Sequence, residues 1–160
     1  MGRPFLYFAY GSNMDPDRLG ARCPSAEMFF LARLDGYKFL MTRKRRSGYG
    51  AADIVEAPDS CVYGVVYTIP REKDRRQLRQ AEGCCADPKA YCEICVTVTD
   101  CGTGQQANVK TFTVCDKHES PVLTTREYRE HVLRGARIRQ LPEWYIEKLS
   151  QKIVISEHSE

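Results

Sequence analysis

The sequence of 160 residues lacks any hydrophobic run that approaches the ~20 residues needed to cross a bilayer. The apolar stretch Phe5–Tyr10 is also too short for the core of a secretory signal peptide. A myristoylation motif fails because the sixth residue is Leu6 rather than Ser or Thr. Charge of one sign is not in large excess either, since 24 Lys and Arg stand against 21 Asp and Glu. We therefore expect a cytoplasmic protein that does not bind a membrane.

The usual signs of nucleic-acid and metal chemistry are also missing. The basic run RKRR, residues 43–46, has no aromatic platform or recognised nucleic-acid module beside it. We therefore interpret it as a solvated loop and expect no nucleic-acid partner. The three histidines, His118, His131 and His158, show no metal-ligand spacing. The turn at Gly11 is not followed by the Lys-Ser or Lys-Thr pair of a P-loop.

Cysteine, by contrast, is plentiful, with eight residues. In a protein without a secretion signal, we expect the thiols to stay reduced. Cys84, Cys85, Cys92 and Cys95 are a group of the residue type that binds zinc. However, residues three apart on a strand point to opposite faces, so Cys92 and Cys95 should not chelate together. We predict free or buried thiols and no metal, and the sequence gives these four cysteines no role.

The hydrophobic pattern predicts a single α+β domain over residues 1–155, followed by a polar tail at 156–160. Asp35-Gly36 is interpreted as a hairpin turn, and residues 58–60 as a second turn. We expect a mixed sheet of six to seven strands, curled toward a barrel, with three to four short flanking helices. The predicted strands span residues 4–10, 28–34, 37–41, 51–55, 61–69, 91–99 and 107–114.

Helix start and stop signals place the predicted helices. Residues 70–83 read PREKDRRQLRQAEG, in which Pro70 suits a first helical turn and Gly83 suits the position that ends a helix. Thr124 and Glu127 have the spacing of a capping box that opens a helix ending near Gly135. A last helix should begin at Pro142.

The stretch FAYGSNM, residues 8–14, joins an aromatic strand to a helix start at Asp15-Pro16. Gly11 permits backbone torsions that other residues avoid, and the N–H groups after it precede a helix N-terminus. Such a turn can bind a carboxylate or a phosphate through main-chain amides. The same residue types also serve simply as caps and turns. The turn alone therefore leaves both interpretations open.

FAYGSNM resembles the FAYGSN-Leu signature of the gamma-glutamylcyclotransferase family. Similar segments follow in the family's order: CPSAEMFFLARLDGYKF, VYGVVYTI, AEG, EYREHVLRGAR and LPEWYIEKL. Together they cover roughly residues 5–150. The resemblance implies an enzyme that closes a γ-glutamyl group into 5-oxoproline and releases an amine or amino acid. It implies no cofactor.

The resemblance also implies the site residues. Glu82 matches the family's general acid and base. Its predicted place at a helix C-terminus, together with partial burial, should raise its pKa and make it a better proton acceptor. Met14 stands where the family usually has Leu. The residues expected to contact the substrate are Tyr7, Tyr10, Gly11, Ser12, Asn13, Met14, Tyr91 and Tyr128.

Several alternatives stay open. Segments 43–49 and 84–90 differ from the best-known animal enzymes, so the substrate could be a γ-glutamylamine or a γ-glutamyl secondary metabolite. A non-catalytic binding protein of the same fold would have no need of Glu82. A third alternative is a nucleic-acid or partner-binding module that uses RKRR and residues 71–80. The expected partner is a small γ-glutamyl molecule, and the sequence leaves a homodimer open.

Overall fold

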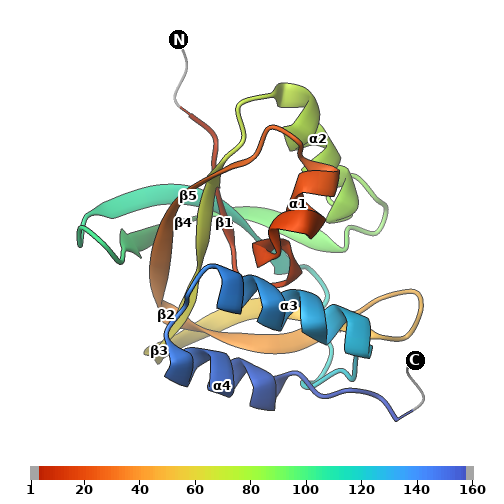
Figure 1. Cartoon of the computed structure of the whole chain (residues 1–160). Coiled ribbons are helices and arrows are strands. Elements are labelled where there is room, and N and C mark those ends of the chain that lie inside the picture. The colour runs from red at the N-terminus through yellow and green to blue at the C-terminus, as the bar shows by residue number, and fades with distance from the viewer. Residues whose placement is uncertain (1–3, 158–160) are drawn as a thin grey trace.

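Within residues 4–157, the part that this computed structural model describes, five strands close into a barrel with four α-helices outside it (Figure 1). The α+β barrel and the number of helices confirm the predicted fold class. Residues 1–3 and 158–160 lie outside the described part, as do His158 and the end of the predicted tail. The elements are β1 (Leu6–Ala9), η1 (Ser12–Met14), α1 (Pro16–Arg22), β2 (Glu27–Lys44), β3 (Gly50–Thr68), α2 (Glu72–Ala81), β4 (Tyr91–Asp100), β5 (Gln106–Val114), α3 (Arg126–Ile138) and α4 (Glu143–Lys152).

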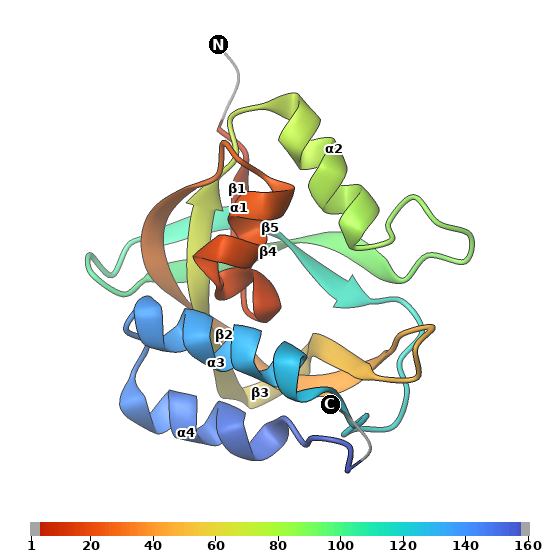
Figure 2. The same ribbon diagram turned by 45° about the vertical axis from the view of Figure 1, so that its right-hand side comes forward.

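The strand order around the barrel is β1-β3-β2-β4-β5. Neighbours pair antiparallel, except that β1 and β5 pair in parallel and close the barrel. In both ribbon views α2 lies at one end of the barrel, α3 and α4 lie at the other, and α1 lies between them (Figures 1 and 2). The short, buried strand β1 leads into the FAYGSNM turn, which packs against α1 and α3 (Figure 2).

The number of strands differs from the prediction because two predicted pairs are each one continuous strand. Gly36 has a φ of +82° and lies at a register shift in β2, so it makes a bulge rather than the predicted hairpin turn. Opposite this bulge, residues 57–60 of β3 pair with no residue of a neighbouring strand within the described chain. The strand can therefore include Pro58, which has no N–H to donate. The reversal occurs instead in the basic segment after Lys44.

The predicted helices are confirmed, with two changes at α3. Thr125, not Thr124, caps the helix, because its hydroxyl accepts a hydrogen bond from the Tyr128 amide at 3.1 Å. Thr124 is buried and donates to the Gly50 carbonyl at 2.7 Å. The helix also continues through Gly135 to Ile138. The glycine serves close packing, since a Cβ there would overlap backbone atoms of residues 14 and 15.

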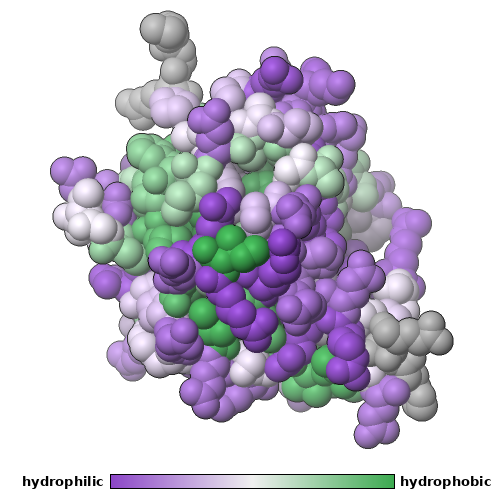
Figure 3. All heavy atoms as spheres, viewed as in Figure 1, coloured by the Kyte–Doolittle hydropathy of each residue, from purple (hydrophilic) through white to green (hydrophobic). Residues whose placement is uncertain are grey.

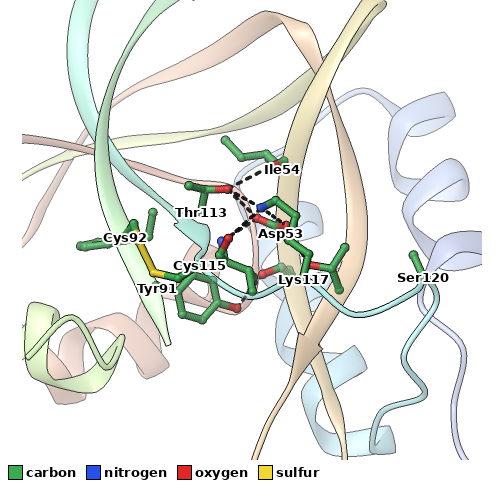
Figure 4. Close-up of polar contacts among 12 residues, drawn as sticks. Asp53, Ile54, Tyr91, Cys92, Thr113, Cys115, Lys117 and Ser120 are labelled. Atoms are coloured by element: carbon green, nitrogen blue, oxygen red, sulfur yellow. Dashed lines mark hydrogen bonds and ion pairs between the residues drawn. A yellow bond between two sulfur atoms is a disulfide. The ribbon is translucent and has the colours of Figure 1, made fainter. Parts of the chain in front are cut away.

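One cysteine pair corrects the expectation that all thiols stay reduced. Cys92, at the start of β4, forms a disulfide with Cys115, just after β5, over a Cα–Cα distance of 5.6 Å (Figure 4). Cys95 is exposed and its sulfur accepts a hydrogen bond from the Lys110 ammonium at 2.8 Å, so it does not share a site with Cys92. Cys84 is free, and burial raises the pKa of its thiol to about 11.

The surface that carries α1 and α3 is mainly hydrophilic (Figure 3). Hydrophobic surface gathers beside it, over the beginning of β2, where Met28 and Phe29 are exposed. Among residues 4–157, no helix has the length and apolar character needed to span a membrane.

We predict that Gly135→Ala destabilises the protein by about 1–3 kcal/mol or more, because the new methyl group overlaps main-chain atoms of the turn that cannot move independently. Gly20→Ala is the matched control, since Gly20 lies in α1 with nothing within 4 Å of the added Cβ. The control should be neutral or up to about 1 kcal/mol more stable. Urea denaturation measures both, and equal stability of the two variants would contradict the packing argument.

Candidate active site

A cavity of about 310 Å³ opens between the turn after β1, the end of α2, the β2–β3 turn and α3. In Figure 2 the loop after α2 and the β2–β3 turn project on the same side of the molecule. The structure brings eight of the nine predicted site residues to this cavity. They are Tyr7, Tyr10, Gly11, Ser12, Asn13, Glu82, Tyr91 and Tyr128.

Glu82 occupies the C-cap of α2, where its amide donates to the Leu78 carbonyl at 3.0 Å. Its side chain is 14% exposed. One carboxylate oxygen accepts a hydrogen bond from the Asn13 amide at 3.0 Å, and the Arg22 guanidinium lies 3.9 Å away. Burial raises the pKa of the Glu82 carboxyl, while Arg22, Arg18 and Asn13 partly oppose the rise. The carboxyl is therefore suited to exchange a proton.

Asn13 connects the turn to this carboxyl. Its side-chain nitrogen donates both to Glu82 and to the Tyr7 hydroxyl, each at 3.0 Å. Its side-chain oxygen accepts from the Arg22 guanidinium at 2.9 Å. The Tyr7 hydroxyl proton has no acceptor within the described chain and can donate into the cavity. Burial raises the pKa of Tyr7 well above its usual value, which keeps this proton in place near neutral pH.

The main chain of the turn provides further donors. The amides of Gly11, Ser12 and Asn13 have no backbone acceptor in the part of the chain that the structure describes. The Met14 amide, in contrast, donates to the Gly11 carbonyl at 3.1 Å, and the Met14 side chain is fully buried in the core. Met14 is the one predicted contact that the structure does not place at the cavity. Its backbone helps to shape the turn instead.

The remaining tyrosines form a wall of the cavity. The Tyr10 hydroxyl donates to the Phe112 carbonyl at 2.5 Å, and the Tyr91 hydroxyl donates to the Ala52 carbonyl at 2.6 Å. The Tyr128 hydroxyl accepts from the Ala52 amide at 2.9 Å. The amide and the carbonyl of Ala52 therefore each position one cavity tyrosine, Tyr128 and Tyr91 respectively. Burial raises the pKa of each of these three phenols, so the wall stays uncharged.

A buried carboxylate supports this wall from behind (Figure 4). Asp53 follows Ala52 in β3 and is fully buried. It accepts hydrogen bonds from the Thr113 hydroxyl at 2.9 Å, from the Val114 amide at 2.9 Å and from the Lys117 ammonium at 2.7 Å. These contacts fix β3 to the end of β5. The neighbouring Ala52 is thereby held where its amide and carbonyl reach the hydroxyls of Tyr128 and Tyr91.

Sequence reasoning missed a set of arginines at the cavity. Two come from α1 and three from the RKRR run, so the interpretation of that run as a solvated loop holds only in part. No spacing rule marks them, because the place of the three RKRR arginines over the barrel rim depends on β2 and β3 each being one long strand, and the place of the other two depends on how α1 packs. They are Arg18, Arg22, Arg43, Arg45 and Arg46.

Known proteins are similar to this chain in both sequence and fold. The model of the AIG2-like family matches residues 61–149. Gamma-glutamylcyclotransferases of Mus musculus and Homo sapiens are each 30% identical to this chain, over 92% and 91% of it and over 78% and 77% of their own lengths. The chain belongs to this AIG2-like, gamma-glutamylcyclotransferase family. A solved gamma-glutamyl cyclotransferase superposes with a TM-score of 0.87 at 28% identity, covering 99% of this chain and 92% of its own.

The residues matched by the AIG2-like family model include Glu82, Tyr91 and Tyr128, while the FAYGSNM turn precedes them. The turn and the matched region meet at the hydrogen bond between Asn13 and Glu82. The FAYGSNM turn and the region matched by the family model, which are separate in the sequence, therefore line the same cavity.

We predict that Glu82→Gln gains stability relative to the wild type as the pH rises from about 4 to about 7. A raised pKa means that the folded chain holds the Glu82 proton more tightly than the unfolded chain does. The contribution of this carboxyl to stability is present below its unfolded pKa and is lost as the pH rises through the folded pKa. Gln does not titrate. Urea denaturation at several pH values gives the difference, and a trend of opposite sign would show that Arg22 and Asn13 outweigh burial.

Proposed function

We propose that this protein is a gamma-glutamylcyclotransferase that converts a γ-glutamyl amino acid or amine into 5-oxoproline and the free amine. The observation that carries the proposal is the hydrogen bond between Asn13, in a turn with unused amides, and the buried Glu82 carboxyl across the same cavity. The names of the mouse and human relatives support the same activity. The cytoplasmic location expected from the sequence stays part of the proposal.

The turn supplies the binding groups for the γ-glutamyl part. The amides of Gly11, Ser12 and Asn13 can donate to a carboxylate or to the γ-carbonyl oxygen. As the γ-carbon becomes tetrahedral, its oxygen gains negative charge, and fixed N–H donors stabilise that charge without reorganising. The Tyr7 hydroxyl is a further donor on the same wall. The tyrosine wall packs around the aliphatic chain of the substrate.

Glu82 supplies the proton transfer. The substrate α-ammonium gives a proton to Glu82, and the free amine attacks the γ-carbonyl carbon to form the ring C–N bond. The C–N bond to the leaving amine then breaks as the proton on Glu82 passes to the departing nitrogen. The ring nitrogen gives its second proton back to Glu82, from which it passes to solvent. An ordinary Glu near ~4.3 and an α-amine near ~8 are separated by roughly 5 kcal/mol of unfavourable transfer. The raised pKa of Glu82 narrows this gap.

We predict that Glu82→Gln loses at least ~100-fold in turnover, because it removes the proton acceptor and donor. The fold should persist, since Gln keeps an oxygen that can accept from Asn13. The assay follows 5-oxoproline release from a panel of γ-glutamyl amino acids and amines.

The matched control is Glu147→Gln, which makes the same charge change at an exposed position of α4 outside the cavity. It should retain wild-type turnover. Circular dichroism of both variants tests the fold. Full activity in a folded Glu82→Gln would remove this residue from the mechanism.

A further inference from the structure

The charge of the cavity exceeds what the γ-glutamyl group requires. Five arginines line it, against Glu82 as the one carboxylate among its lining residues. A γ-glutamyl group carries an ammonium and a carboxylate, which cancel near neutral pH. A neutral amino acid as leaving group adds one carboxylate. The remaining positive charge has no counterpart in such a substrate.

Most of these arginines also lack an acidic partner in the protein. Of the five, only Arg22 lies within 4.0 Å of a carboxylate among residues 4–157, namely Glu82. The Nε of Arg18 is buried without a hydrogen-bond partner in the described chain. The side chains of Arg43 and Arg46 make no hydrogen bond or ion pair within residues 4–157. Unpaired guanidinium groups in a partly enclosed space are sites for an anion, with bidentate geometry available.

The arginines are held close together. The guanidinium carbons of Arg18 and Arg45 lie 5.8 Å and 5.0 Å from the centre of the Tyr128 ring. Arg45 Nε also donates to the Tyr49 carbonyl at 3.3 Å, which fixes it to the β2–β3 turn. Burial lowers the pKa of Arg18, and the charges of Arg22 and Arg45 lower it further. An additional anion would relieve this mutual repulsion.

We propose that the β2–β3 turn selects a leaving group with an acidic side chain, so that γ-glutamyl-glutamate and γ-glutamyl-aspartate are preferred substrates. Arg43, Arg45 and Arg46 bind the extra carboxylate. This proposal rests on the cyclotransferase activity proposed above. A leaving group with a free ammonium, such as lysine, is disfavoured by the same charges.

The test compares γ-glutamyl-glutamate with γ-glutamyl-glutamine, which have nearly the same shape and differ by one charge. For the wild type, kcat/KM should be at least about tenfold higher with the glutamate peptide, as expected for a charge-assisted hydrogen bond. γ-Glutamyl-lysine should be the poorest of the three. The preference should shrink as salt rises, because salt screens partly exposed charges.

Arg43→Gln and Arg46→Gln, singly and together, should reduce the glutamate-to-glutamine ratio toward one, mainly through KM. Neither side chain makes a hydrogen bond or ion pair within residues 4–157, so the fold should tolerate both changes. Arg76→Gln is the matched control, with the same charge change at an exposed position of α2 outside the cavity. It should leave the ratio unchanged.

Two failures are distinguishable. If both peptides yield 5-oxoproline at equal kcat/KM, or if the arginine variants keep the wild-type ratio, this proposal is overturned while the cyclotransferase activity stands. If no peptide yields 5-oxoproline, the proposed activity fails. Calorimetric binding of the two peptides then tests whether the arginines prefer an acidic leaving group. Tighter binding of the glutamate peptide supports that preference, and equal binding overturns it.

Discussion

The side-chain amide of Asn13 is the contact on which the rest of the cavity depends. It donates to Glu82 and Tyr7 and accepts from Arg22, so its hydrogen bonds join the turn after β1 to the end of α2, to β1 and to α1. Because its oxygen and nitrogen have partners of opposite kind, the amide has one favourable orientation. The carboxyl and the main-chain donors are thereby held at a fixed separation, which an intramolecular reaction requires.

The electrostatics of Glu82 reflect two opposed effects. Burial favours the neutral acid, while Arg22, Arg18 and the Asn13 amide favour the carboxylate. The Arg22 guanidinium stays 3.9 Å from the carboxylate, and its closer contact is with Asn13. A closer, bidentate ion pair would lower the pKa of the carboxyl and weaken it as a base. Burial of Tyr10, Tyr91 and Tyr128 keeps the surrounding wall uncharged.

Local sequence signals predicted much of this structure, and their failures have physical causes. Pro70 and Gly83 bounded α2 correctly, because proline and glycine restrict or free the backbone by themselves. Asp35-Gly36 was misjudged as a hairpin, since a glycine with positive φ suits a bulge as well as a turn and only the pairing with β3 decides between them.

The residues of the candidate site also differ in whether local sequence could reveal them. FAYGSNM and Glu82 were identifiable by resemblance to a family whose motifs are short and ordered. The arginines were not, because the position of the RKRR arginines depends on strand continuity and that of Arg18 and Arg22 on the packing of α1. The Cys92–Cys115 disulfide was likewise invisible in the spacing, since it joins residues brought together by the β4–β5 pairing.

The length of β2 and β3 has an evolutionary consequence. One half of this hairpin is a wall of the barrel, paired on one side with β1 and on the other with β4, and its register is locked by those neighbours. The far half has no strand partner outside the hairpin within residues 4–157, although the segment after β5 hydrogen-bonds to it, and it ends in the arginine-bearing tip. Residues at that tip can be exchanged among descendants without disturbing the barrel or the acid-bearing helix. With the leaving-group selection proposed for this tip, a change of leaving group requires substitutions only in the short turn, while the residues proposed to close the ring stay the same.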